Sequence, residues 1–252
     1  MAIVAFANQK GGVGKTTSAV NVAACIGKKG KKVLLVDMDP QGNATSGVGI
    51  SKKNIKSSIY EVLLGEVGAK DAIIETKYKN LSVLPSTIAL AGAEFDLNET
   101  EGKGKSLSNI LADLKDDYDY IIIDCPPTLG LLTVNALSAS NGVVIPMQCE
   151  FFSLEGLSQL IMTVKRVRQS YNPSLEISGI LLTMYNGRLV LTNQVIAELK
   201  KYYADKLFKT PITRSVKLSE APGFGEPICY YDPYSKGSLE YMDVAKELMM
   251  RI

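Results

Sequence analysis

The 252-residue sequence contains no histidine, no tryptophan and only four cysteines, Cys25, Cys125, Cys149 and Cys229. Without histidine, a catalytic triad that depends on imidazole is excluded. The cysteines are widely spaced and form no Cys-x-x-Cys pair, which argues against a zinc site. Few, scattered cysteines are typical of a reducing compartment, so we expect a cytoplasmic protein.

Long apolar runs are missing as well. No stretch of about 18 apolar residues is available to cross a membrane, and the first ten residues lack the basic segment and cleavage site of a signal peptide. Apolar residues make up 46% of the chain and charged residues 21%, which is typical of a folded globular protein. We expect a single domain over residues 1–252.

Charge is unevenly distributed although the formal net charge is only +2. Residues 1–150 carry 15 Lys and Arg against 16 Asp and Glu, whereas residues 160–217 carry 10 against 3. A nearly neutral chain with one basic segment is typical of a protein that meets an anionic partner at one place.

Short apolar runs alternate with segments of helical periodicity. Continuous Val, Ile and Leu runs indicate strands buried on both faces, as in a parallel sheet. The sequence therefore predicts an α/β fold, a doubly wound and mostly parallel sheet with helices on both faces. The predicted strands are Ala2–Ala7, Lys32–Val36, Leu81–Leu84, Tyr120–Ile123, Gly142–Pro146 and Ile177–Thr183, and the predicted helices are Lys15–Lys29, Ser57–Leu64, Lys105–Asp116, Leu131–Ser140, Ser153–Gln169, Leu191–Tyr203 and Gly237–Arg251.

The strongest motif is Lys10-Gly11-Gly12-Val13-Gly14-Lys15-Thr16-Thr17, between a predicted strand and a predicted helix. This context is typical of a phosphate loop, in which backbone N–H groups bind phosphate, the Lys15 ammonium reaches the β- and γ-phosphates, and the Thr16 hydroxyl holds Mg²⁺. The first glycine of the ordinary pattern is replaced by Gln9, and Lys10 adds a second cation, so the loop is a deviant Walker form. A tight glycine turn before a capping threonine is the structural alternative.

Two aspartates at predicted strand ends complete the motif set. Asp39 lies in Val36-Asp37-Met38-Asp39-Pro40, and Asp124 ends the run Ile121-Ile122-Ile123-Asp124. Carboxylates at the carboxyl ends of parallel strands face the crevice where ligands bind. Asp124 is a candidate Mg²⁺ ligand, and Asp39 is a candidate for holding metal-bound water or orienting an attacking water; an Asp-Pro turn is the alternative for Asp39. Cys125 is expected to be a small buried residue rather than a nucleophile.

Together these segments resemble the ParA/Soj family of chromosome- and plasmid-partitioning ATPases, in its short Soj-like form. The resemblance extends over residues 3–248. It rests on the phosphate loop, the Asp37–Asn43 segment and Asp124-Cys125-Pro126-Pro127, together with Leu131–Leu137, Pro146–Glu150, Ser153–Leu157 and Leu218–Pro222.

The resemblance implies an ATP- and Mg²⁺-dependent homodimer that sandwiches two nucleotides and has no membrane partner. Lys10 is expected to reach the partner's nucleotide, with Lys15 and Asp39 as the other catalytic residues. The resemblance also implies that the protein binds double-stranded DNA without sequence preference and associates with the nucleoid in the ATP state. It further implies that a ParB/Spo0J-like protein stimulates ATP hydrolysis. Met184, Thr213 and Ser215 are implied nucleotide contacts, although Thr213-Arg214-Ser215 replaces the family's usual Pro-Arg-Asn, and Asn186 stands where an acidic residue is common.

The basic segment supplies the candidate DNA contacts, Arg188, Arg214 and Lys217. No recognition-helix signature accompanies these residues, so we expect contacts to phosphate without sequence preference. Ordinary solvated charges, or an Arg214 near nucleotide, are the alternatives.

Three other functions share parts of this pattern. A membrane-associated ATPase similar to MinD needs a basic amphipathic helix, whereas residues 237–252 are not basic and their stripe of Leu239, Met242, Ala245, Leu248 and Met249 is expected to pack in the core. An iron–sulfur relative needs paired cluster cysteines. A non-catalytic DNA-binding scaffold is disfavoured because Lys15, Thr16, Asp39 and Asp124 are all present.

Overall fold

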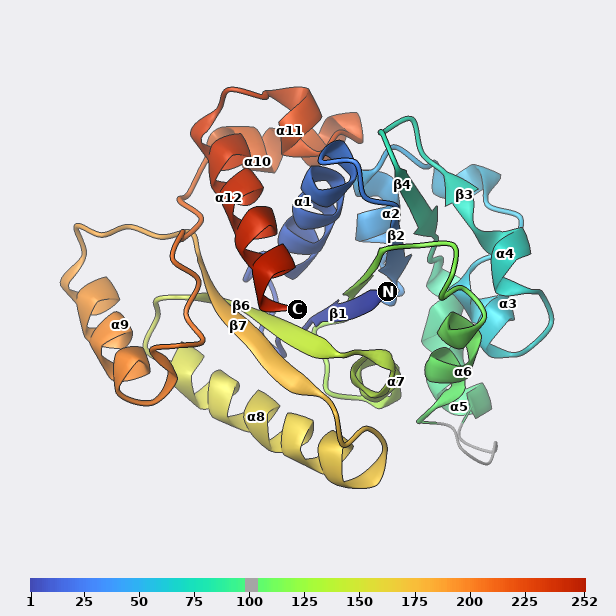
Figure 1. Ribbon diagram of the computed structural model, residues 1–252, viewed down its shortest axis with the longest axis horizontal. Coiled ribbons are helices and arrows are strands. Elements are labelled where there is room, and N and C mark those ends of the chain that lie inside the picture. Colours follow the sequence, from blue (N-terminus) through green and yellow to red (C-terminus); the bar gives the residue numbers. More distant parts are fainter. Residues whose placement is uncertain (98–103) are drawn as a thin grey trace.

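The computed structural model describes residues 1–97 and 104–252, and in this part of the chain the strands form one seven-stranded sheet (Figure 1). The strand order is β3-β4-β2-β5-β1-β6-β7, and all neighbours are parallel except the antiparallel pair β3 and β4. The predicted α/β fold with a mostly parallel sheet is confirmed. The strands are β1 (Ala2–Phe6), β2 (Val33–Asp37), β3 (Ile74–Glu75), β4 (Leu81–Leu84), β5 (Tyr120–Asp124), β6 (Gly142–Gln148) and β7 (Glu176–Thr183).

Parallel strands need long crossover connections, and each of these connections here contains at least one helix. The α-helices are α1 (Lys15–Lys28), α2 (Asn43–Gly47), α3 (Ile59–Leu63), α4 (Ala69–Ala72), α5 (Ala93–Asp96), α6 (Ser106–Ala112), α7 (Leu131–Ala139), α8 (Ser153–Ser170), α9 (Val190–Tyr203), α10 (Val216–Glu220), α11 (Ile228–Tyr231) and α12 (Lys236–Arg251). Short 3₁₀ turns are η1 (Lys52–Asn54), η2 (Ile88–Gly92) and η4 (Ala221–Phe224).

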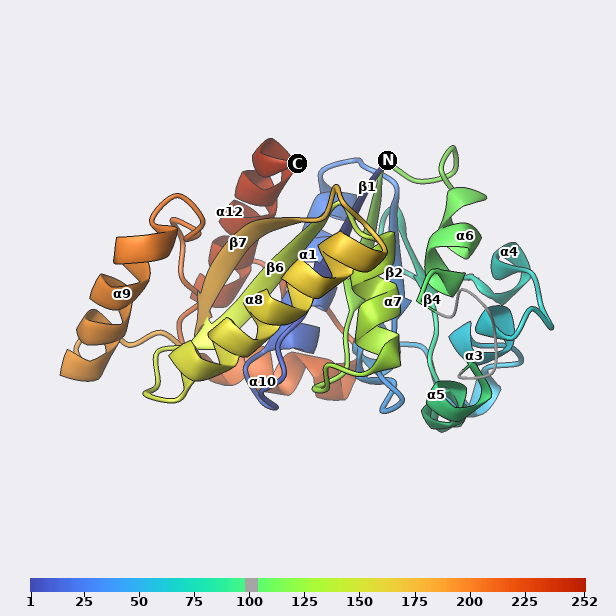
Figure 2. The same ribbon diagram turned by 90° about the horizontal axis from the view of Figure 1, so that it is seen from below.

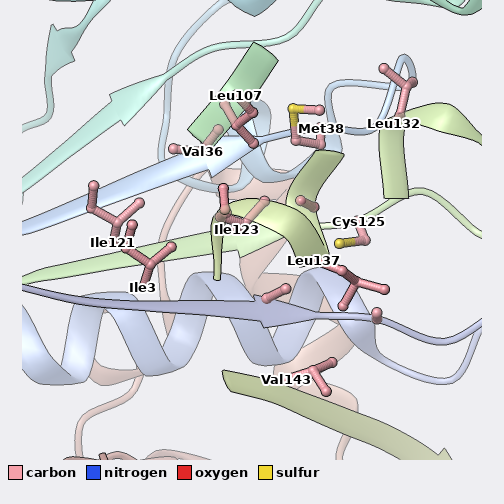
Figure 3. Packing of buried hydrophobic residues seen from close by; sticks show 14 of the residues in the cluster. Ile3, Val36, Met38, Leu107, Ile121, Ile123, Cys125, Leu132, Leu137 and Val143 are labelled. Carbon is pink, nitrogen blue, oxygen red and sulfur yellow. The ribbon is translucent and has the colours of Figure 1, made fainter. Parts of the chain in front are cut away.

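The sheet is covered on both faces. Helices α6, α7 and α8 lie on one side of it, and α1 and α12 lie on the other (Figures 1 and 2). Because successive residues of a strand point to opposite faces, Ile3 of β1 joins the first of these cores while Val4 joins the second. Figure 3 shows the first core, where Ile121 and Ile123 of β5 pack with Leu137 of α7. Two-sided burial explains why the strands are continuously apolar.

The predicted elements are found with their ends shifted by at most two residues, with one exception. The helix expected over Lys105–Asp116 is wrong at its end, because α6 stops at Ala112 and tight turns follow. Asp113, Asp116 and Asp117 crowd this terminus, and negative charge is unfavourable at the carboxyl end of a helix. The two-residue edge strand β3 carried no predictive pattern.

The C-terminal helix corrects a second expectation. Leu239 was expected in the core but is 57% exposed, because the buried face of α12 is centred on Tyr241, Val244 and Leu248. Ala245 is fully buried, as expected. Among the described residues, no helix has the length and apolar character needed to span a membrane.

Candidate nucleotide-binding site

The phosphate loop joins β1 to α1 at the carboxyl edge of the sheet. Gly12 and Gly14 adopt φ of 72° and 83°, a left-handed conformation that favours glycine over residues with a side chain. Gly14 precedes the first turn of α1, whose N–H groups have no partner within the helix. The loop therefore presents backbone donors and the positive end of a helix dipole, which together bind anions.

Three side chains hold the carbonyl groups of the loop. The Lys15 Nζ donates to the Lys10 carbonyl at 3.0 Å, the Gln148 Nε2 donates to the Gly12 carbonyl at 3.0 Å, and the Thr183 Oγ1 donates to the Val13 carbonyl at 2.8 Å. Within the described ranges, no hydrogen bond takes up the backbone N–H groups of residues 11–17. The loop is thus fixed through its acceptors while its donors remain available to a phosphate.

Lys15 is only 6% exposed, and burial lowers the pKa of its ammonium. Asp124 gives the largest opposing effect, and Asp39 raises the pKa of Lys15 as well. Lys15 is thus a cation removed from water whose charge the nearby carboxylates compensate only in part. A bound phosphate anion would therefore stabilise its charged form strongly.

Asp124 ends β5 and is completely buried. Neither of its carboxylate oxygens accepts a hydrogen bond that satisfies ordinary geometry from any described residue. Burial, followed by the neighbouring Asp37, raises the pKa of Asp124 well above its usual range, whereas Thr16 and Lys15 act in the opposite direction. A buried polar side chain that lacks a partner is a candidate ligand for an ion or for its water shell.

Mg²⁺ fits this set of donors. Among the described residues, no cluster of three Asp, Glu, His or Cys side chains is able to enclose a metal. Mg²⁺ does not need such a cluster, because it keeps several waters and uses one or two protein oxygens together with substrate phosphates. The Thr16 hydroxyl and the unpaired Asp124 carboxylate meet that requirement, with Asp39 as the third candidate from the sequence.

Asp37 ends β2, and the sequence motif alone predicts no role for its side chain. One of its oxygens accepts the backbone N–H of Thr45 at 2.8 Å and the Thr45 hydroxyl at 2.7 Å, and the other accepts the Asp39 N–H at 3.2 Å. Burial raises the pKa of Asp37 to about 6, although the bonds from Thr45 oppose this shift. Asp37 therefore fixes both the Asp39 backbone and the start of α2. The only sequence signal was the second carboxylate at the end of a strand.

Asp39 lies two residues beyond the end of β2. Its side chain accepts the Gln41 N–H at 2.9 Å, and its carbonyl accepts the Gly42 N–H at 2.8 Å, so the alternative Asp-Pro turn does form. The residue is nevertheless 7% exposed and lies close enough to Lys15 and Asp124 to influence their pKa values. The turn and a role at the nucleotide are therefore compatible.

The residues expected to contact the base meet beside the phosphate loop. A cavity of 130 Å³ is lined by Gly14, Thr17, Thr183, Met184, Ile212, Thr213, Arg214, Ser215, Leu218, Ser219 and Tyr241. Met184 has φ of 48°, unusual for a residue with a side chain, and its sulfur lies 2.9 Å from the Gln148 Nε2. The Thr213 hydroxyl and backbone N–H both donate to Glu240, at 3.0 Å and 2.9 Å, so its methyl group remains for the cavity.

The Lys10 ammonium forms an ion pair with Glu150, which follows β6 at the surface. Gly11 is exposed, and a Cβ at Gly11 would meet no atom of the chain within 4 Å. Neither residue is therefore required by the packing of a single chain.

The three candidate DNA contacts have different surroundings. Arg188 is exposed; its backbone N–H donates to the Asn186 side chain at 3.1 Å, and its guanidinium has no bond to any residue that the structure describes. Lys217 lies 3.3 Å from Glu220 and 5.7 Å from the Tyr231 ring centre, and Glu220 raises the pKa of Lys217. Arg214 is exposed but lines the cavity next to Gly14, so both of its predicted roles remain open.

Comparisons with known proteins decide the family. Residues 1–177 match the AAA domain family. The chain is 55% identical over 246 residues to the sporulation initiation inhibitor protein Soj of Bacillus subtilis, covering 98% of this chain and 97% of that protein. It is 48% identical to the chromosome partitioning protein ParA of Myxococcus xanthus, covering 99% and 88% of the two chains. The chain belongs to the Soj/ParA family of partitioning ATPases. The resemblance drawn from the motifs is thereby confirmed.

Solved structures of relatives share the fold of this Soj/ParA chain. Cobyrinic acid a,c-diamide synthase from Mycobacterium smegmatis with bound ADP and magnesium has a TM-score of 0.87 and 37% identity, covering 98% of this chain and 94% of that chain. A plasmid partition protein from Borrelia burgdorferi has a TM-score of 0.78 and 29% identity, covering 100% and 99%. These two differ in the activity they are named for, so the fold alone does not define function.

Proposed function

We propose that this chain is an ATP-dependent DNA-partitioning ATPase. ATP and Mg²⁺ bind at the phosphate loop, ATP binding drives sandwich dimerisation, and the dimer binds double-stranded DNA of the nucleoid without sequence preference. Hydrolysis of ATP to ADP and phosphate, stimulated by a ParB/Spo0J-like protein, resets the switch. The observation that carries the proposal is the combination of unused loop N–H groups, a buried Lys15 and a buried Asp124 with no hydrogen-bond partner.

Each part of the phosphate loop has a place in nucleotide binding. The N–H groups of Gly11, Gly12, Val13 and Gly14 bind phosphate oxygens, and Lys15 neutralises the β- and γ-phosphates. Thr16 and Asp124 hold Mg²⁺, which neutralises charge on the phosphate oxygens when it is bound. Thr17 follows in the first turn of α1 and borders the cavity for the base. Met184, Thr213 and Ser215 complete that cavity, which supports an adenosine next to Gly14.

Lys10 and Gly11 support the dimer. The loop already holds one buried cation in Lys15, whereas Lys10 is at the surface and points to Glu150. Open space around Gly11 leaves room for close approach of a second subunit. In the proposed dimer, Lys10 reaches the partner's nucleotide, and Asp39 positions the attacking water or a metal-bound water.

DNA binding in this proposal depends on the number of phosphate contacts. One subunit offers Arg188, Arg214 and Lys217, and a dimer doubles that set. Each phosphate contact adds to the binding free energy, so the monomer binds DNA weakly and the ATP dimer binds DNA well. The affinity of the dimer for DNA falls steeply as the salt concentration rises. Arg188 and Arg214 are stronger candidates than Lys217, because no ion pair with a described residue occupies either guanidinium, whereas Lys217 pairs with Glu220.

The test combines a sizing experiment with a DNA mobility assay. Wild type with ATP should dimerise and shift two unrelated duplexes equally, whereas ADP should leave a monomer with weak binding. Lys10→Ala should bind ATP as a monomer without dimerising, and Gly11→Val should do the same because of its branched side chain. Asp39→Ala should dimerise and remain on DNA longer than wild type. Equal DNA binding with ADP, or strong preference for one duplex, would contradict the proposal.

Arg188→Glu separates DNA binding from dimerisation. The variant should form the ATP dimer at the wild-type protein concentration but lose most of its DNA affinity. Lys246→Glu is the control, since it makes the same change of charge at an exposed position on α12. If Arg188→Glu and Lys246→Glu lose affinity equally, the effect reflects net charge and not a contact.

A further inference from the structure

Two phenylalanines are exposed side by side at the start of α8. Phe151 is 74% exposed and Phe152 is 71% exposed, and their rings meet edge to face with centres 5.3 Å apart. They lie in the connection from β6 to α8, at the same edge of the sheet as the phosphate loop. Two large aromatic side chains gathered in water are typical of a contact surface, because their exposure is unfavourable and their burial stabilises a complex.

This connection is tied to the phosphate loop on both sides of the aromatic pair. Before the pair, Gln148 donates to the Gly12 carbonyl at 3.0 Å, and Glu150 forms the ion pair with Lys10. After the pair, Gln159 accepts a hydrogen bond of 2.6 Å from the Gln9 side chain. A protein that covers the pair therefore lies against the opening of the nucleotide site.

A groove lies beside the pair on the same surface. It has a volume of 580 Å³, and its lining includes Pro127 and Leu129 after β5, Phe152 itself and Gly156 on α8, together with Lys10. The surface thus carries a projecting aromatic group and a hollow next to each other. It also carries opposite charges, Lys10 and Glu150, within one ion pair. A surface that carries both a projection and a hollow, and charges of both signs, is able to meet a second copy of itself across a two-fold axis.

We infer that the Phe151–Phe152 pair is an anchor of the contact between two copies of this chain in the ATP state. In this arrangement the pair of each subunit packs into the partner's groove beside Pro127 and Leu129, and the Lys10–Glu150 pair of one chain gives way to contacts across the interface. The inference rests on the proposed function, because it assumes an ATP-dependent dimer. It adds the surface that recognises the second copy and explains why that surface adjoins the nucleotide.

The test compares Phe151→Ser/Phe152→Ser with Tyr202→Ser. Tyr202 is a matched control, since it is 72% exposed, pairs with Tyr203 at 6.4 Å, and lies on the second half of α9 towards the opposite edge of the sheet (Figures 1 and 2). Dimerisation is measured by sedimentation with a non-hydrolysable ATP analogue, and nucleotide affinity by titration of the monomer with a fluorescent analogue. The double variant should keep its nucleotide affinity, while its dimer dissociation constant rises by about 30-fold or more, as for truncation of an aromatic anchor. Tyr202→Ser should match wild type.

The outcomes separate this inference from the proposed function. If wild type stays monomeric with the ATP analogue, the proposed function fails and the inference fails with it. If wild type dimerises and the double variant dimerises equally well, only the inference is wrong. Retained dimerisation with lost stimulation by a ParB-like protein would assign the pair to that partner and overturn the inference. Should the double variant melt below wild type, the single Phe151→Ser variant is measured in its place, with the same expectation of weaker dimerisation.

Discussion

Asp124→Asn should make the protein without Mg²⁺ and nucleotide more stable while it abolishes Mg²⁺ binding. The substitution keeps the shape of the side chain and removes its charge. Asp124 is completely buried, no described residue satisfies its oxygens, and Asp37 lies close enough to raise its pKa further. The charged carboxylate is therefore expected to lower the stability of the protein without bound metal.

The size of the gain follows from two opposing costs. A buried carboxylate without a full partner costs several kcal/mol, whereas an unpaired buried amide costs about 1–3 kcal/mol. The variant should therefore gain about 2 kcal/mol of unfolding free energy, the difference between these costs. For a chain of this length that gain corresponds to a melting temperature about 4–8 °C higher.

The gain should depend on pH in a defined direction. The pKa of Asp124 is raised in the folded state, so the folded protein binds the proton more tightly than the unfolded chain. The stability contributed by this group is present below its unfolded pKa and is lost as the pH rises through the folded pKa. Asparagine does not titrate, so the advantage of the variant should grow as the pH rises above the unfolded pKa of Asp124 and should be larger at about pH 7.5 than at about pH 4.5.

Thermal unfolding in the presence of a chelator measures this effect, and Asp243→Asn serves as the control because it removes an exposed carboxylate in the middle of α12. Mg²⁺ with ATP should raise the melting temperature of wild type and change that of Asp124→Asn much less. If Asp124→Asn melts below wild type at about pH 7.5 without metal, the unpaired carboxylate is not the source of strain. An equal response of both proteins to Mg²⁺ with ATP would remove Asp124 from the metal site.

Three further substitutions test the site and its supports. Lys15→Ala should lower ATP affinity by about 100-fold or more in a fluorescence titration, since the loop loses its buried cation; unchanged affinity would remove Lys15 from that role. Thr45→Val should lower the free energy of unfolding, measured by chemical denaturation, by about 2–3 kcal/mol and should raise the pKa of Asp37 above about 6. The reason is that it removes the hydroxyl that donates to Asp37 and accepts from the Ser86 N–H. Thr45→Ser is the control, because it should keep both bonds. Gly142→Ala should lower the free energy of unfolding by about 1–3 kcal/mol, since its Cβ would lie 1.9 Å from the Ser178 Oγ. The double variant Gly142→Ala/Ser178→Ala should recover this stability in thermal unfolding. If it does not, the clash is not the cause.

Local sequence was sufficient for the centre of the fold and for placing the loop Lys10–Thr17 between a strand and a helix. The strands of a parallel sheet are continuously apolar because both faces are covered, so periodicity alone identified all of them except the two-residue edge strand Ile74–Glu75. The loop Lys10–Thr17 and the carboxylate Asp124 follow strands directly, and the carboxyl ends of parallel strands meet at one edge. That edge is predictable from the sequence, whereas the pairing of β1 with β5, which sets Asp124 opposite Phe6 and next to the loop, is decided by the tertiary structure.

Tertiary packing decided what depends on residues distant in sequence. The bonds from Gln148 and Thr183 that orient the loop carbonyls join positions more than 130 residues apart, and no local pattern encodes them. The same is true of the cavity where Thr213 and Ser215 meet the loop, and of the ion pair between Lys10 and Glu150. Leu239 fits a helical stripe in the sequence yet is exposed, because only the docking of α12 on the sheet determines which face is buried. Hydrophobic periodicity indicates the secondary structure that one segment prefers, whereas the contacts between segments depend on how all of the segments pack together.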